Sequence, residues 1–130
     1  FDMNYYGTPK SFVLDEMEAG RSVILEIDVE GGMNVKRSFP DAVLIFIAPP
    51  SMSQLKERLI GRRTETPEQI ERRFQTAFLE VERAKAYDYV VINNVLDVAV
   101  SRVEQILQAE RCRCLRNQAF LNQLTGGKQL

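Results

Sequence analysis

Two carboxylates at the end of an apolar segment are the first residues whose types and spacing could do chemistry. Glu26 and Asp28 close the run SVILEID over residues 22–28. Its apolar and β-branched residues predict a buried parallel strand, and alternate side chains of a strand point to one side. The pair could hold a metal ion, accept hydrogen bonds from a base or act in acid/base catalysis. A solvated strand end is the alternative.

Arginines gathered between residues 58 and 73 could bind phosphate. Arg58 and Arg62 are four residues apart and would share a helix face. Because the planar guanidinium matches pairs of phosphate oxygens, arginines on a helix, a loop and the next helix could close around a polyphosphate. Interleaved glutamates make surface ion pairing the alternative, and the residues alone favour it. The set is Arg58, Arg62, Arg63, Arg72 and Arg73.

Hydroxyl side chains near the N-terminus form a third candidate. The segment NYYGT over residues 4–8 places Tyr6 and Thr8 on a predicted loop. A phenol and a hydroxyl suit a phosphate or a base edge, and a packed turn is the alternative. No G-x-x-x-x-G-K-[ST] motif occurs in the 130 residues, and Gly31-Gly32 is not part of a dinucleotide-binding fingerprint.

Composition narrows the class of protein. The chain has 130 residues, 45% hydrophobic and 27% charged, as expected of one globular domain with a real core. Its formal net charge of −1 argues against sequence-independent binding to nucleic acid or to a membrane surface. Without histidine or a second cysteine pair, Cys112 and Cys114 do not predict a zinc site. We expect free thiols and a cytoplasmic location.

The elements that must position these residues alternate along the chain. Helix signals and apolar strand patterns predict a mainly parallel α/β sheet flanked by helices. Ligands of such sheets bind beyond the carboxyl ends of the strands, which marks Glu26, Asp28, Pro49-Pro50 and Asn93. The predicted strands are 22–28, 41–48 and 89–93, and the predicted helices are 10–20, 29–38, 51–59, 66–86 and 96–124, the last with a break near the cysteines.

Taken together, short segments in a fixed order resemble the guanylate kinase family. The resemblance extends from Phe1 to about Leu124 and implies the P-loop-containing nucleoside monophosphate kinase fold. It also implies transfer of the γ-phosphoryl group of ATP to GMP, with Mg²⁺. The segments are NYYGT (4–8), ILEIDVEG (24–31), IFIAPPS (45–51), LKERL-x-GR (55–62), I-x-x-R (70–73) and VIN (91–93).

The resemblance assigns roles on the GMP side to four residues. Tyr6 corresponds to a tyrosine that holds the GMP phosphate, and Thr8 to a hydroxyl residue that reads guanine. Asp28 corresponds to an aspartate that accepts hydrogen bonds from guanine nitrogens. Glu26 stands where the family often has aspartate, which keeps the charge and leaves its role open.

On the ATP side, the resemblance assigns catalytic arginines and one asparagine. Arg58, Arg62 and Arg73 correspond to arginines of the lid region that clamp the ATP phosphates and the group in transfer. Asn93 corresponds to an asparagine near the adenosine part of ATP. The implied partners are therefore ATP and GMP, and we expect neither a nucleic acid nor a membrane as a partner. No residue of the chain is assigned as a metal ligand. Formation of a homo-oligomer is left open.

The resemblance also predicts an incomplete domain. In the family, the P-loop, a central sheet strand and the first part of the GMP-binding region precede the tyrosine motif. We therefore expect the C-terminal part of a longer guanylate kinase, without activity of its own. The implied subdivision is 1–20 for the end of the GMP-binding region, 21–60 for the core, 61–72 for the lid, 73–124 for the core and C-terminal helices, and 125–130 for a flexible tail.

Two other functions remain open. A non-catalytic guanylate-kinase-like domain could bind phosphopeptides in a scaffold protein, although the arginines and the carboxylate pair favour an enzyme. Another nucleoside monophosphate kinase is the second alternative, against which Thr8 and Asp28 argue for guanine.

Overall fold

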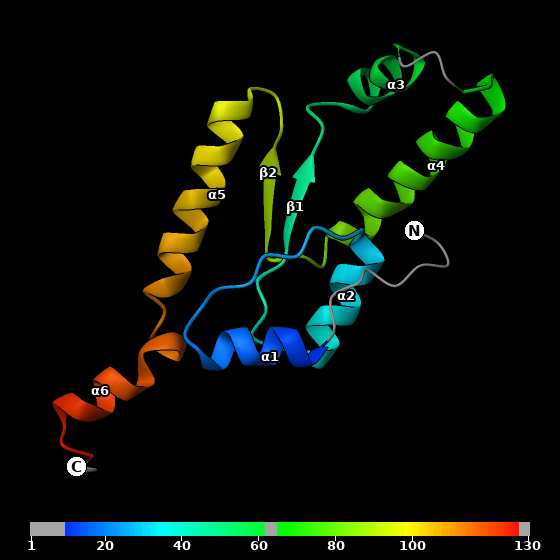
Figure 1. Ribbon diagram of the computed structural model, residues 1–130. Coiled ribbons are helices and arrows are strands. Elements are labelled where there is room, and N and C mark those ends of the chain that lie inside the picture. The colour runs from blue at the N-terminus through cyan, green and yellow to red at the C-terminus, as the bar shows by residue number, and fades with distance from the viewer. Residues whose placement is uncertain (1–9, 62–64, 128–130) are drawn as a thin grey trace. The chain divides into compact units, whose positions relative to one another are not determined.

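The structure is a computed structural model that describes residues 10–61 and 65–127. Its contacts divide the chain into two compact units, Phe1–Ala42 and Val43–Leu130. The subdivision into a GMP-binding end, core, lid and tail that the resemblance implies stays a prediction. Figure 1 labels the helices and strands. The elements are α1 (Lys10–Glu18), α2 (Val29–Ser38), β1 (Ile45–Ala48), α3 (Met52–Gly61), α4 (Pro67–Ala84), β2 (Tyr89–Ile92), α5 (Leu96–Arg111), the 3₁₀ turn η1 (Cys114–Asn117) and α6 (Gln118–Leu124).

The helices largely follow the sequence signals. Helix α2 has the predicted bounds, and the predicted long helix over 96–124 is interrupted at the cysteines into α5, η1 and α6. Gly20 ends α1 as expected, because its φ of +81° is a left-handed conformation that suits glycine at a helix end. There the Gly20 amide donates to the Met17 carbonyl (3.0 Å) and the Arg21 amide to the Glu16 carbonyl (3.0 Å).

The predicted strand over residues 22–28 is wrong for this structure. Among the described residues only β1 and β2 pair as strands. The segment keeps the alternation of a strand: Val23, Leu25 and Ile27 are half-buried, whereas Glu26 and Asp28 are exposed. Side-chain alternation is a local property, but a β ladder needs a neighbouring backbone, and the described residues supply none.

The second unit is built on a parallel strand pair, which confirms the predicted strand direction. Ile45 of β1 lies opposite Tyr89 of β2, and Ala48 lies opposite Ile92. The observed strands are shorter than the predicted segments 41–48 and 89–93. Helix α5 packs on β2, and the buried core of this unit includes Leu44, Val91 and Ala99.

Helices α3 and α4, which connect the two strands, are joined by a lysine. The Lys56 ammonium lies 5.2 Å from the centroid of the Phe74 ring and 3.8 Å from Glu71 Oε2. A cation over an aromatic face and a partly exposed ion pair each contribute modestly. Lys56 of α3 is therefore held against α4 by both an aromatic and an acidic side chain.

A buried carboxylate ties β2, α5 and η1 together. Glu110 is 5% exposed; its Oε2 accepts from the Tyr89 hydroxyl and its Oε1 from Arg116 Nη2 at 3.0 Å. Arg113 Nη1 lies 3.6 Å from the same Oε1. The Tyr89 hydrogen bond, with help from both arginines, lowers the pKa of Glu110, and the same bond raises the pKa of Tyr89.

These shifts predict a pH window for stability. Because the folded pKa of Glu110 lies below 4.5, its contribution is present above that pH and is lost as the pH falls through the lowered pKa. Because the folded pKa of Tyr89 lies above 10.0, its contribution is lost as the pH rises through the raised value. Glu110→Gln should lower the melting temperature at pH 7 by about 3–6 °C and flatten the acid side of the profile. Thermal unfolding against pH tests this, with exposed Glu104→Gln as control; equal profiles for both variants would contradict it.

Candidate functional site

The predicted site residues fall into three groups. Glu26 and Asp28 belong to the first unit, where the structure describes them, and Arg58, Arg73 and Asn93 belong to the second. Three further candidates lie outside the described residues, and their roles stay predictions: Tyr6, Thr8 and Arg62.

Asp28 starts helix α2. Its backbone is extended (φ −72°, ψ 172°), and its Oδ1 accepts from the Gly31 amide at 2.7 Å, while its carbonyl accepts from the Gly32 amide at 2.9 Å. The first amides of a helix lack partners within the helix, and an aspartate oxygen is a favoured acceptor for them. Oδ2 accepts no hydrogen bond from residues 10–61 and 65–127, so one oxygen of this exposed carboxylate is fixed and the other is available.

The Asp28 carboxylate sits where a side chain at residue 31 would lie. A Cβ added to Gly31 would come within 2.9 Å of Asp28 Oδ1 and 3.3 Å of Ile27 Cβ. The first distance is shorter than real Cβ contacts, so a side chain there would displace the carboxylate from the helix start. The glycine thus allows the close approach that orients Asp28.

Glu26 lies on the same side of the segment as Asp28, since both are exposed while Leu25 and Ile27 are half-buried. Among the residues that the structure describes, no group of three or more acidic, cysteine or histidine side chains could hold a metal ion. The carboxylate pair offers hydrogen-bond acceptors.

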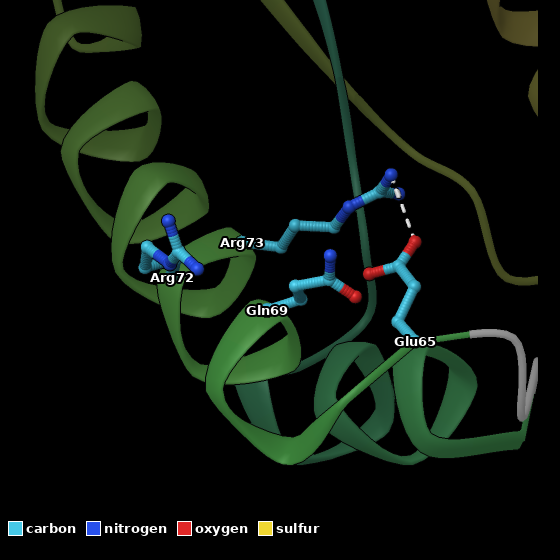
Figure 2. A pocket seen from close by; sticks show the side chains of 4 residues that line it. All are labelled: Glu65, Gln69, Arg72 and Arg73. Atoms are coloured by element: carbon cyan, nitrogen blue, oxygen red, sulfur yellow. Dashed lines mark ion pairs between the residues drawn. The ribbon is translucent and has the colours of Figure 1, made fainter.

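An open pocket of about 470 Å³ lies at the start of α4, lined by Glu65, Gln69, Arg72 and Arg73. Figure 2 shows Arg73 reaching from the helix toward Glu65, whereas Arg72 points elsewhere. Arg73 Nη2 is 2.8 Å from Glu65 Oε1. Two arginines, one glutamate and one glutamine thus line the pocket, and the half-exposed guanidinium of Arg73 can bind an anion.

The start of α4 fixes the rim of this pocket. Thr66 caps the helix: the Gln69 amide donates to Thr66 Oγ1 (3.2 Å), and the Thr66 amide donates to Gln69 Oε1 (3.0 Å). Pro67 follows at the first helical position. This reciprocal capping box holds the backbone next to Glu65 in place.

The structure does not bring all the predicted arginines into this pocket. Arg58 lies in the last turn of α3, where its charge suits the helix dipole, and its side chain is exposed and does not line the pocket. Arg72, which no role was assigned to, does line it. Among the described residues, the arginines that line the pocket with Glu65 are therefore Arg72 and Arg73, and Arg58 is not one of them.

Asn93 lies at the carboxyl end of the strand pair. Its amide donates to the Ala48 carbonyl at 2.8 Å, directly before Pro49 ends β1. Because the strands are parallel, their carboxyl ends meet at one edge, as the sequence predicted. The contact of Asn93 with adenosine stays a prediction.

Sequence reasoning missed Glu65 and Gln69. A helix start was predicted at residue 66, but Gln69 was not identified as the reciprocal partner of Thr66, although a glutamine three residues after a threonine is a known signature. Glu65 counted only as one of several interleaved acids. It precedes the helix, so no helical spacing relates it to Arg73.

The fold places the chain among nucleoside monophosphate kinases. A crystal structure of guanylate kinase from Anaplasma phagocytophilum superposes with a TM-score of 0.68 at 30% sequence identity, covering 83% of this chain and 51% of that one. The family model described as guanylate kinase matches residues 1–110. The chain belongs to the guanylate kinase family.

Curated relatives support the same family. A guanylate kinase of Caldanaerobacter subterraneus subsp. tengcongensis is 49% identical over 114 residues, which are 88% of this chain and 55% of that protein. A guanylate kinase of Bacillus cereus is 45% identical over 124 residues, 95% of this chain and 60% of that protein. The chain thus spans little more than half the length of these relatives. No helix within residues 10–61 and 65–127 is long and apolar enough to cross a membrane.

The cap at Asp28 can be tested by two substitutions. Asp28→Ala removes the acceptor for the Gly31 amide and should lower the unfolding free energy by about 1 kcal/mol. Asp28→Asn keeps an acceptor and should leave stability nearly unchanged. Denaturant unfolding measures both; equal losses for the two variants would show that the carboxylate does not act as the cap.

Proposed function

We propose that the protein containing this chain transfers the γ-phosphoryl group of ATP to GMP, giving ADP and GDP. One observation carries the proposal: 49% identity to a guanylate kinase over a stretch that covers 88% of this chain. Because the chain spans 55% of that relative, the activity is proposed for the whole protein and not for the 130 residues alone. A cytoplasmic location is proposed with it.

On the GMP side, we assign the guanine to Asp28 and Glu26. With Oδ1 engaged by the Gly31 amide, Asp28 presents Oδ2 in a fixed direction to an external donor. Guanine offers an amide N–H and an amino group, both donors, so an ionised carboxylate complements it. Glu26 adds a second acceptor on the same side. Tyr6 and Thr8 are proposed to hold the GMP phosphate and the guanine, respectively.

On the ATP side, we assign the phosphates to Arg58, Arg62 and Arg73, and the adenosine part to Asn93. Phosphoryl transfer spreads negative charge over the oxygens of the moving group, so positioned guanidinium groups lower the barrier. Arg73 supports this assignment best, because its side chain is about half exposed, lines the pocket beside Arg72 and is already oriented.

Magnesium is proposed to arrive with ATP. The described residues contain no cluster of three metal-ligating side chains, and Mg²⁺ commonly binds phosphate oxygens and water with few protein ligands. When bound, the ion neutralises charge on the phosphates, while the arginines of this chain bind and orient them.

Asp28→Asn separates recognition of guanine from helix capping. The asparagine oxygen can keep the Gly31 amide, but its amino group then faces the guanine donors. The kcat/KM for GMP in the whole protein should fall about tenfold or more, with the KM for ATP within about twofold. Coupled-assay kinetics and a melting curve test this, with exposed Asp15→Asn as matched control. Equal losses for the two nucleotides would contradict the role of Asp28.

Arg73→Ala should lower kcat more than it raises KM. Its charge is needed most when the phosphoryl group is in transfer, so kcat should fall about a hundredfold in the whole protein. Steady-state kinetics with both substrates tests this against Arg111→Ala, an exposed arginine of α5. A change confined to KM would assign Arg73 to ground-state binding only.

A further inference from the structure

Glu65 is held unlike the other acids near the arginines. Its side chain is 16% exposed, whereas that of Glu71, which lies near Lys56, is 56% exposed. Oε1 pairs with Arg73, and Oε2 is buried without a hydrogen-bond donor among the described residues. Burying a carboxylate oxygen unpaired costs free energy, so this ion pair is a poor means of stabilising the fold.

The local backbone explains how Glu65 is kept in this place. It directly precedes Thr66, whose capping box with Gln69 fixes the first turn of α4. Arg73 extends from the second turn of the same helix back toward it (Figure 2). The Glu65–Arg73 ion pair therefore connects the segment before the helix to the guanidinium group, and both residues line the pocket.

The ion pair with Glu65 leaves most of the guanidinium group available. Arginine has five N–H donors in one plane, and the pair with Glu65 uses Nη2 at 2.8 Å. Arg73 remains 54% exposed, so its other donors can reach a ligand. A long side chain fixed at one edge loses less rotamer freedom when a phosphate binds the other edge.

The pair does not cancel the positive charge of the pocket. Arg72 also lines it and pairs with no carboxylate within the described ranges. Two arginines and one glutamate among the lining residues leave an excess positive charge near the pocket. Glu65 can therefore orient Arg73 without closing the pocket to phosphate.

We propose that Glu65 is a positioning residue that orients Arg73 for phosphoryl transfer. The inference rests on the proposed function, since it needs the phosphoryl group that Arg73 would contact. Glu65 itself touches no substrate: its Oε1 forms an ion pair with Arg73 Nη2 and so holds the guanidinium group at one edge.

A double-mutant cycle on the whole protein tests this. Glu65→Gln keeps the size of the side chain and removes its charge, so kcat should fall about tenfold while the KM for ATP changes by less than about twofold. In an Arg73→Ala background the same substitution should cause no further fall, because its effect passes through Arg73. Glu68→Gln, an exposed acid in the first turn of the same helix, should leave kcat unchanged.

A second variant and melting curves show whether a fall in kcat comes from lost positioning of Arg73 or from a loss of folding. Glu65→Asp keeps the charge but shortens the reach by one methylene, and should also lower kcat, with a melting temperature near that of the wild type. A tenfold fall that persists in the Arg73→Ala background, or tighter ATP binding with unchanged kcat, would overturn the positioning role. If the wild-type protein forms no GDP from ATP and GMP, the proposed function itself fails and the role of Glu65 fails with it.

Discussion

The amides that a helix leaves unpaired at its start are the constraint on which the candidate sites depend. Each such amide needs an acceptor, and α2 and α4 both obtain one from a side chain, Asp28 in one case and Thr66 in the other. The acceptor must adopt an extended backbone just before the helix, so the residues around it have fixed directions. In both places a functional candidate lies at the cap or one residue before it.

The two caps orient functional groups in different ways. At α2 the capping group is itself the candidate: Asp28 uses one oxygen for the Gly31 amide and keeps the other for a ligand. At α4 the capping box involves only Thr66 and Gln69, and it places Glu65, which then holds Arg73. In the first case the fold orients a carboxylate directly, and in the second it orients a guanidinium through an intermediary.

Local rules explain which parts could be predicted from the sequence. The bounds of α2 and the start of α4 were predicted from the sequence alone, and both helices begin at a side-chain cap. The alternation over residues 22–28 was equally local, but a β ladder depends on a neighbouring strand, and the predicted strand was not found. The parallel pairing of β1 with β2 followed from the order of strands and helices, and therefore the carboxyl-end position of Asn93 could be predicted.

Contacts between side chains without a shared periodicity could not be predicted, and they decide which charges have a function. Glu110 and Glu65 are both shielded carboxylates beside arginines, yet their surroundings differ. At Glu110 both oxygens accept hydrogen bonds, from Tyr89 and Arg116, so the network is complete and stabilises the fold.

At Glu65 one oxygen is paired and the other has no hydrogen-bond partner among the described residues, while the paired arginine remains half exposed to solvent. Within the part of the chain that the structure describes this network is incomplete, and exposed guanidinium donors can bind an anion. The net charge of −1 gives no sign of this difference, because it counts the arginines at Glu110 and those at Glu65 alike. Among the described residues, the number of satisfied oxygens, rather than the number of arginines, distinguishes the network at Glu110 from the ion pair at Glu65.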